Sequence, residues 1–201
     1  MKKFKRGNED DDDFEADNSF HVSCVEAEEG TRLFNIFLFG LIENERQFIP
    51  AIKALQVAND DDVVMIHLST PGGDIDATDT FLHALSMCRA EQVIFQASGG
   101  VHSAGTFILM HADNVILSEG FNSLVHCGSL GHGGKYSDWK SSTAFAQRHF
   151  ENQLRTAYTG FMTDEEIEAM IAGKDFWFDG ADFAERLDRR AAFRAATEDE
   201  E

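Results

Sequence analysis

The apolar residues of this chain form two patterns, one that predicts strands and one that predicts helices. Compact apolar runs over residues 33–39, 63–68 and 92–97 predict strands, the second of them buried. Between the runs, residues 48–57 and 76–87 carry apolar side chains three and four positions apart, the spacing of a helix with one buried face. Strands alternating with helices in this way predict an α/β layered fold with parallel strand pairs.

The second half of the chain continues the alternation with more helix. We expect a helix over 103–111, short strands over 115–117 and 123–126, and helices over 137–158, over 164–171 and from 179 or 180 to 187. Thr163 and Glu166 form the sequence signature of a capping box. The long helix is a candidate projecting arm, on which Phe145, Phe150 and Leu154 would be exposed in a monomer and would favour self-association.

The chain has 201 residues, which favours a single domain. We expect that domain over residues 19–193. Seven acidic residues between Glu9 and Asp17 predict a disordered, solvated leader over 1–18, although docking to a basic partner is the alternative reading. A shorter acidic tail is expected over 194–201.

Charge and cysteine usage exclude several classes of protein. The formal net charge of −19 would repel phosphate, which argues against binding to nucleic acid or to anionic membranes. Three widely spaced cysteines without a CxxC pair are typical of free thiols in a reducing compartment. No secretory signal pattern and no apolar stretch long enough to span a membrane is visible, so a soluble, cytoplasmic protein is expected.

Four segments carry candidate chemistry, and the first is Ser-Thr-Pro-Gly-Gly-Asp over residues 69–74. A turn with Pro71 and two glycines leaves backbone N–H groups pointing outward, where they suit an anion or a developing oxyanion. A tight strand-to-helix turn without chemistry is the plainer interpretation. The segment is not a P-loop, because no Gly-Lys-Ser/Thr follows.

The second segment, residues 99–105, places Ser103 among small residues at a strand-to-helix junction. An exposed hydroxyl is expected there, with the Ala104 N–H at the helix N-terminus, where the helix dipole favours negative charge. The segment departs from GxSxG because residue 101 is valine. A packing turn is the alternative.

The third segment is a strand that ends in His126, whose imidazole could take a proton from a serine hydroxyl. A structural role is the alternative. His111, His132 and His149 could in principle join His126 at a metal, but no metal-binding spacing supports that, and we expect no metal.

The fourth segment is Lys-Asp-Phe-Trp-Phe, in which aromatic neighbours would partly desolvate Asp175 so that it needs a partner. A helix-end cap or a surface charge is the alternative, and Asp179 and Asp182 are competing carboxylates.

Taken in order and at their intervals, the four segments resemble the Clp protease proteolytic subunit family, often called ClpP. The resemblance covers roughly residues 30–190 and implies a crotonase- or ClpP-like fold of ββα units with a handle helix, the handle falling at about 127–160. It implies a Ser-His-Asp triad of Ser103, His126 and Asp175. It also implies an oxyanion hole from the N–H groups of Gly73 and Ala104 and substrate binding by Gly72, Gly73, Cys127 and Gly128.

The resemblance further implies an assembly and a substrate class. A homo-oligomeric ring, or two stacked rings, would enclose the active sites, and an AAA+ unfoldase would feed in unfolded protein or peptides. The subunit itself would need no cofactor, since ATP is used only by the unfoldase. Three departures from the family fit a divergent phage-encoded or accessory member: Cys127-Gly128 where Gln-Pro is common, a loop over 98–102 one residue longer than usual, and a leader without an apolar start.

Three rival functions remain open from the sequence. A crotonase-like acyl-CoA enzyme would share the layered core but would not need the Ser-His-Asp set. A prohead-type or signal-peptide-peptidase-like serine protease with a Ser-Lys pair would need a suitable lysine, for which Lys135 and Lys140 are the candidates. A catalytically silent ring subunit could carry the same residues in a misaligned arrangement.

Overall fold

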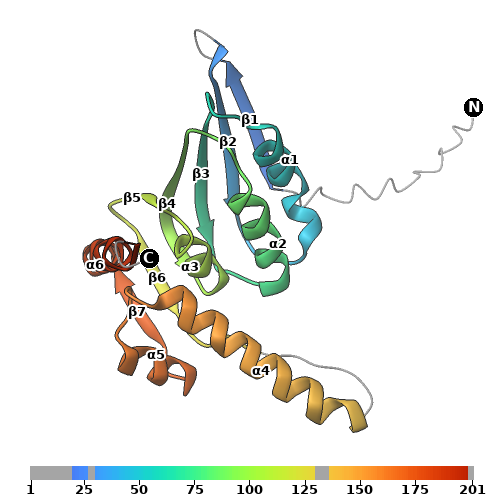
Figure 1. Ribbon diagram of the computed structural model, residues 1–201, viewed down its shortest axis with the longest axis vertical. Helices are drawn as coiled ribbons and strands as arrows, with labels where there is room; N and C mark the ends of the chain where they lie inside the picture. The colour runs from blue at the N-terminus through green and yellow to red at the C-terminus, as the bar shows by residue number, and fades with distance from the viewer. Residues whose placement is uncertain (1–19, 27–29, 130–135, 199–201) are drawn as a thin grey trace, which may run out of the picture.

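A computed structural model describes residues 20–26, 30–129 and 136–198. The acidic leader, the end of the acidic tail and most of the glycine-rich stretch that precedes the long helix lie outside the described residues. Within these residues a seven-stranded sheet forms the centre of the fold, and helices pack on it and beside it (Figure 1). The expected α/β layered fold is confirmed.

The strands pair in the order β1-β2-β3-β4-β6-β7, and β5 pairs with β4 beside this path. Their bounds are β1 His21–Glu26, β2 Arg32–Phe39, β3 Val63–Thr70, β4 Gln92–His102, β5 Asn114–Leu117, β6 Asn122–Val125 and β7 Phe176–Asp179. The pairs from β2 to β6 are parallel, whereas β1 and β7 join antiparallel at the two ends of the order. Strand β4 has two successive partners on one side, since its residues 94–97 pair with β5 and residues 100–102 with β6.

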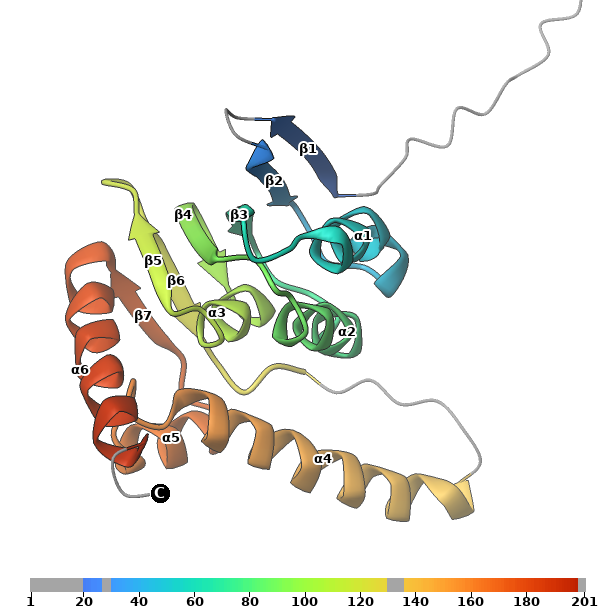
Figure 2. The same cartoon turned by 45° about the horizontal axis from the view of Figure 1, so that its top comes forward.

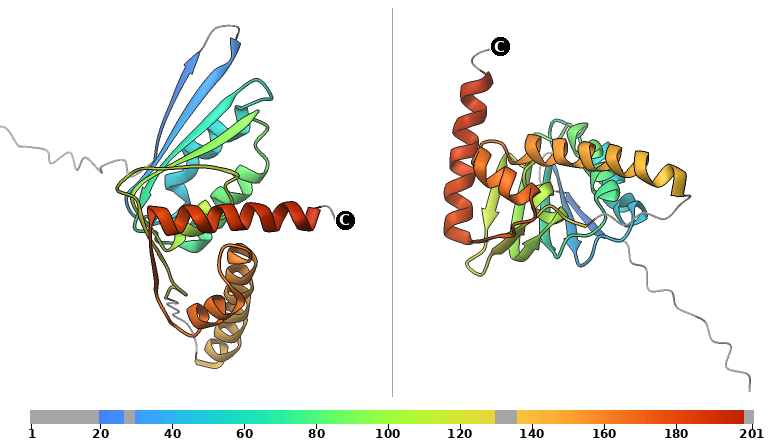
Figure 3. Two further views of the ribbon diagram at one scale, coloured as in Figure 1. Left: turned by 90° about the vertical axis from the view of Figure 1, so that its left-hand side faces the viewer. Right: turned by 90° about the horizontal axis from the view of Figure 1, so that it is seen from below.

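The helices are η2 Glu45–Phe48 (a 3-10 turn), α1 Ile49–Val57, α2 Ile75–Ser86, α3 Ala104–Leu109, α4 Tyr136–Tyr158, α5 Asp164–Ile171 and α6 Gly180–Glu198. Helices α1, α2 and α3 cover one face of the sheet, and α4 extends below them (Figures 2 and 3). The predicted capping box is present: Thr163 Oγ1 accepts from the Glu166 N–H at 3.2 Å, and Glu166 accepts from the Thr163 N–H at 3.0 Å. No described helix combines the length and apolar content needed to cross a membrane.

The core lies between the sheet and these helices. Alternate residues of the strands are fully buried on the helix side, among them Ile36, Ile66 and Phe95, as a two-residue period requires. A second aromatic cluster of Phe121, Phe161, Phe178 and Phe183 fixes β7 and the first turn of α6 against β6. Burial of large apolar side chains of this kind is the main favourable contribution to folding.

Two expectations about the elements were wrong. Residues 98–102 are not a loop, because β4 continues to His102 by pairing with β6, and its register with β3 shifts after Leu68. Phe150 and Leu154 are not exposed on the arm: Leu154 is buried and Phe150 is half-buried, because the last turns of α4 pack on the core. Phe145 is exposed as expected, with 64% of its surface accessible.

Candidate active site

Ser103 lies between the end of β4 and the start of α3 in a strained backbone conformation. Its φ of 54° and ψ of −123° make it the one described non-glycine residue with positive φ. A conformation of this kind costs about 1–3 kcal/mol and persists only where surrounding contacts hold it. One such contact is its N–H, which donates to the Leu124 carbonyl of β6 at 2.8 Å. The turn leaves the serine half-buried rather than enclosed.

Two backbone N–H groups near Ser103 suit a developing negative charge. Ala104 is the first residue of α3, so its N–H has no acceptor within its own helix. On the neighbouring turn, the Gly72 carbonyl accepts from Ile42 at 2.9 Å and the Asp74 N–H donates to Ile42 at 2.8 Å. The Gly73 N–H lies between these bonds and has no backbone acceptor among the described residues.

The glycine turn approaches Ser103 so closely that a side chain would not fit at Gly72. A Cβ atom at that position would lie 2.6 Å from the His102 carbonyl oxygen, 2.7 Å from Ser103 Cβ and 2.8 Å from the Ala104 nitrogen. Gly72 also has a φ of 90°, which favours glycine. The absence of a side chain therefore allows the turn after β3 to pack directly on the turn after β4.

A cavity of about 420 Å³ collects several of the predicted residues. Ser103, His126, Gly73, Ala104 and Gly128 all line it. Gly72, Cys127 and Asp175 do not line it. The other lining residues, which the sequence did not assign to the site, are Asp74, Ile75, Asp76, Phe107, Ser129, Phe150, Leu154 and Tyr158.

His126 has a local hydrogen bond that fixes the role of one ring nitrogen. The Gly128 N–H donates to His126 Nδ1 at 3.3 Å, so Nδ1 is an acceptor and carries no proton. In a Ser-His-Asp triad the carboxylate accepts a proton from Nδ1–H while Nε2 takes the serine proton. The ring is therefore in the opposite arrangement to the one that a triad needs.

Asp175 is exposed and makes no hydrogen bond or ion pair among the described residues. The expectation that its aromatic neighbours would partly desolvate it was wrong, because Trp177 points away from the core with 63% of its surface accessible. The sheet nevertheless brings its backbone towards His126. Val125 and Phe176 are the last pair of the antiparallel β6–β7 ladder, and His126 and Asp175 are the next residue on each strand.

A buried pair of hydroxyls connects the backbone of Ser103 to the base of α4. Thr106 Oγ1 donates to the Ser103 carbonyl at 2.7 Å and lies 2.7 Å from the Tyr158 hydroxyl. Complete burial raises the pKa of Tyr158, so this phenol stays neutral. The position of Thr106, three residues after Ser103, is the one sequence signal that could have indicated this contact.

His102, His111 and Cys127 make contacts that do not suit them to catalysis in the Ser103 cavity. His102 Nε2 lies 2.9 Å from Asn122 Oδ1, and its ring meets the Trp177 ring edge-on. His111 Nδ1 bonds to the Phe107 carbonyl at 2.9 Å, and burial lowers the pKa of its imidazole. Burial raises the pKa of the Cys127 thiol, which disfavours a reactive thiolate. His132, Lys135 and the side chain of Lys140 lie outside the described part of the chain.

A family profile described as Clp protease matches residues 30–185, more than three quarters of the chain. The chain belongs to the Clp protease family. At the level of the family it is a Clp-type serine protease, and the resemblance in the sequence is confirmed. No curated protein sequence matches this chain.

Among solved structures, this Clp protease family member is similar to a mutant of ClpP1 from Listeria monocytogenes. The two share 19% sequence identity with a TM-score of 0.60, over 76% of this chain and 86% of the other. At this identity the likeness concerns the fold alone, and it agrees with the layered architecture described above.

Proposed function

We propose that this chain is the subunit of a serine endopeptidase that cleaves unfolded polypeptides through Ser103, His126 and Asp175. The observation that carries the proposal is the single cavity shared by the strained Ser103, His126 and the Gly73 and Ala104 backbone. A strained serine at a strand-to-helix turn, beside unpaired N–H groups, is the arrangement that acyl transfer uses.

In the proposed reaction, Ser103 Oγ attacks the carbonyl carbon of the scissile bond and its proton passes to His126 Nε2. The N–H groups of Gly73 and Ala104 donate to the resulting oxyanion. His126 then returns the proton to the leaving amine, and an acyl-enzyme on Ser103 remains. Water deacylates it by the same route, with His126 again accepting and returning a proton.

The proposal requires one local rearrangement at His126. The Gly128 N–H has to release Nδ1, and the ladder between β6 and β7 has to extend by one pair so that the Asp175 carboxylate accepts from Nδ1–H. Neither change needs a new register, because Val125 and Phe176 already pair. Binding of an extended peptide beside Gly128, which lines the cavity, is a change that can release this bond.

The proposed assembly is a homo-oligomeric ring, or two stacked rings, served by an AAA+ unfoldase that consumes the ATP. Family membership supports this, and so does the exposed Phe145 on α4, since large apolar side chains on a projecting helix suit a protein contact.

Labelling with a fluorophosphonate probe tests the nucleophile and its base. Wild type should label, while Ser103→Ala and His126→Ala should lose labelling and keep their circular dichroism. A folded, assembled wild type that does not label would contradict the proposal. Labelling that survives Ser103→Ala would assign the reaction to another serine.

A catalytically silent ring subunit is the second candidate, and the hydrogen bond from Gly128 to His126 Nδ1 favours it. The two candidates differ in the tautomer of His126 within the assembled protein. Nitrogen-15 chemical shifts of the imidazole report it: a protonated Nδ1 in the assembled, peptide-bound state supports the endopeptidase, and a protonated Nε2 that persists supports the silent subunit.

A further inference from the structure

A groove of about 1020 Å³ runs between β5 and α6, away from the Ser103 cavity. It exists because of where β7 ends. Strand β7 pairs with β6 up to the Asn122–Asp179 pair, and the chain then leaves the sheet as α6, which begins at Gly180. The side of β5 that faces α6 therefore has no strand beside it, and β4 is the one described partner of β5.

An unpaired strand edge presents backbone donors and acceptors that another strand can use. The opposite wall of the groove consists mainly of short side chains of α6, including Ala184, Ala191 and Ala195. These side chains leave space next to the β5 edge without blocking its backbone. An extended peptide that adds to β5 as a strand fits a site of this shape.

One end of the groove contains a buried arginine without an ion-pair partner in the described part of the chain. Arg190 is 5% exposed, its Nη2 donates to the Met110 carbonyl, and its Nε has no hydrogen-bond partner among the described residues. Burial and the nearby Arg194 lower the pKa of Arg190 to about 10, so the cation is costly where it lies but still charged at neutral pH. A carboxylate beside Arg190 would offset the cost of the buried charge.

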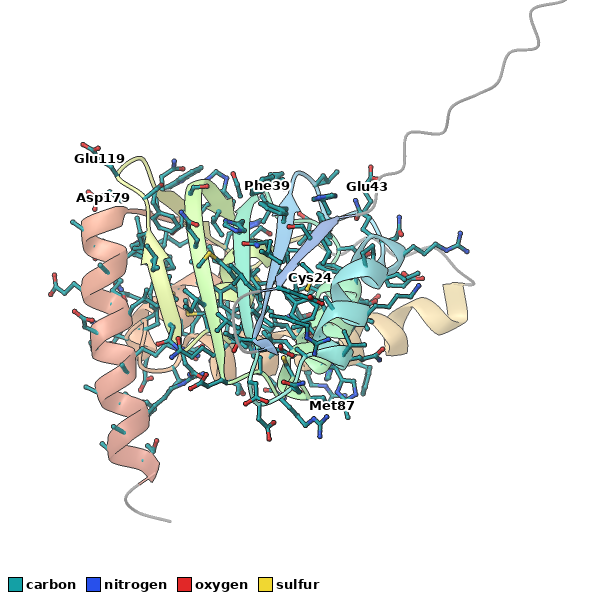
Figure 4. All side chains as sticks on the ribbon, turned by 90° about the horizontal axis from the view of Figure 1, so that it is seen from above. Cys24, Phe39, Glu43, Met87, Glu119 and Asp179 are labelled. Atoms are coloured by element: carbon teal, nitrogen blue, oxygen red, sulfur yellow. The ribbon has the colours of Figure 1, made fainter. Side chains whose placement is uncertain are left out.

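The other end of the groove is acidic. Glu119 and Asp179, labelled in Figure 4, lie next to each other where β5 ends and α6 begins. Asp188, two residues before Arg190 on α6, also lines the groove, whereas Asp113 is already paired with Arg194 at 2.9 Å. The two ends therefore differ in charge, and the groove as a whole prefers a ligand with more positive than negative charge.

We propose that this groove binds the C-terminal segment of an extended polypeptide, with its free carboxylate at Arg190 and basic side chains towards Glu119 and Asp179. Arg194 bonds to Asp113, which directly precedes β5, so this part of α6 lies beside the start of β5. A peptide whose C-terminus lies at Arg190 therefore runs antiparallel to β5. From Asp179 to Arg190 the helix rises about 16 Å at ~1.5 Å per residue. An extended peptide covers that length with about five residues at ~3.4 Å each. The site is independent of the proposed chemistry at Ser103.

Fluorescence anisotropy with one labelled peptide in two forms tests the proposal. The probe is fluorescein-labelled lysyl-lysyl-alanyl-valyl-alanyl-valine with a free carboxylate, and its C-terminal amide is the comparison. The Ser103→Ala chain is used so that the probe is not hydrolysed. The acid should bind at least tenfold more tightly than the amide, and Arg190→Met should remove that difference.

Tryptophan substitutions at two neighbouring alanines of α6 give a second test, which holds even if the Arg190 variant does not fold. Ala191 lines the groove and Ala192 does not, and both are exposed. Ala191→Trp should abolish binding, whereas Ala192→Trp should leave it unchanged, with equal helix content in both. Equal affinities for acid and amide, equal binding by the two tryptophan variants, or no binding at millimolar peptide would each overturn the proposal.

Discussion

His126 and Asp175 are the first residues beyond the last pair of the β6–β7 ladder, one on each strand. If they complete a triad, Asp175→Asn should lower peptidase activity by about 10⁴-fold, because an amide holds the histidine in the wrong tautomer. Asp182→Asn is the control, since it removes one exposed ion pair with Arg186. Peptide hydrolysis by the assembled protein measures both, and similar losses in the two variants would exclude a specific role for Asp175.

Alanine substitutions at Gly72 and Gly40 distinguish the effect of crowding at Ser103 from the effect of backbone strain alone. Both have φ near 90°, at 90° and 91°, but a Cβ at Gly40 would meet nothing within 4 Å. Gly40→Ala should therefore cost about 1–2 kcal/mol, the penalty for a left-handed alanine. Gly72→Ala should cost more and should also lose fluorophosphonate labelling, because it displaces Ser103 and the Ala104 N–H. Urea unfolding and labelling of both variants test this, and equal effects would show that the close packing has no consequence.

Phe145 provides a test of the proposed oligomer. Its side chain is 64% exposed on α4 and stacks on His149 at a centroid distance of 5.9 Å. Phe145→Glu should weaken self-association by about tenfold or more, as expected when a buried aromatic contact is lost from an interface. Sedimentation velocity measures the change, with Gln147→Glu, which adds the same charge nearby, as the control. An unchanged distribution in both variants would remove Phe145 from any interface.

Asp62 predicts a specific pH dependence of stability. The carboxylate is buried and accepts hydrogen bonds from Arg32 and from the Asn59 N–H, and these hold its pKa at about 2, below the ordinary 3.8. Since the folded-state pKa is depressed, its stabilisation is complete above about pH 4–5 and is lost as the pH falls towards 2. The difference in urea midpoint between wild type and Asp62→Asn should therefore shrink from pH 6 to pH 2. Asp61→Asn, which changes an exposed neighbour, should show no such trend.

The main elements could be predicted from the sequence because their patterns are local. Strand β3 follows from a compact apolar run, helix α2 follows from apolar residues three and four positions apart, and Thr163 and Glu166 mark the start of α5. The second part of β4 could not be predicted in this way. Its small residues, including Gly99 and Gly100, are typical of a loop, and this part becomes a strand because β6 pairs with residues 100–102 and β3 pairs with Val101.

The candidate site, too, could be predicted from the sequence only in part. Ser103 and His126 could be predicted because Ser103 follows a predicted strand and His126 ends one, and the two residues line the same cavity. The orientation of His126 could not, since it depends on one hydrogen bond from Gly128. Tyr158 and Leu154 line the cavity because the base of α4 packs there, and no periodicity distinguishes that part of the helix from its exposed start.

The hydrogen bonds that join Ser103, Thr106 and Tyr158 have a consequence for how this protein opens. The Ser103 carbonyl accepts from the Thr106 hydroxyl, which also bonds to the buried Tyr158, so the turn at Ser103 and the last turns of α4 should exchange their amide hydrogens as one cooperative unit. The outer turns of α4, around Phe145, lie beyond that connection. They can unwind or bend without altering the backbone of Ser103, so contacts made at the tip of the helix and geometry held at its base can change independently.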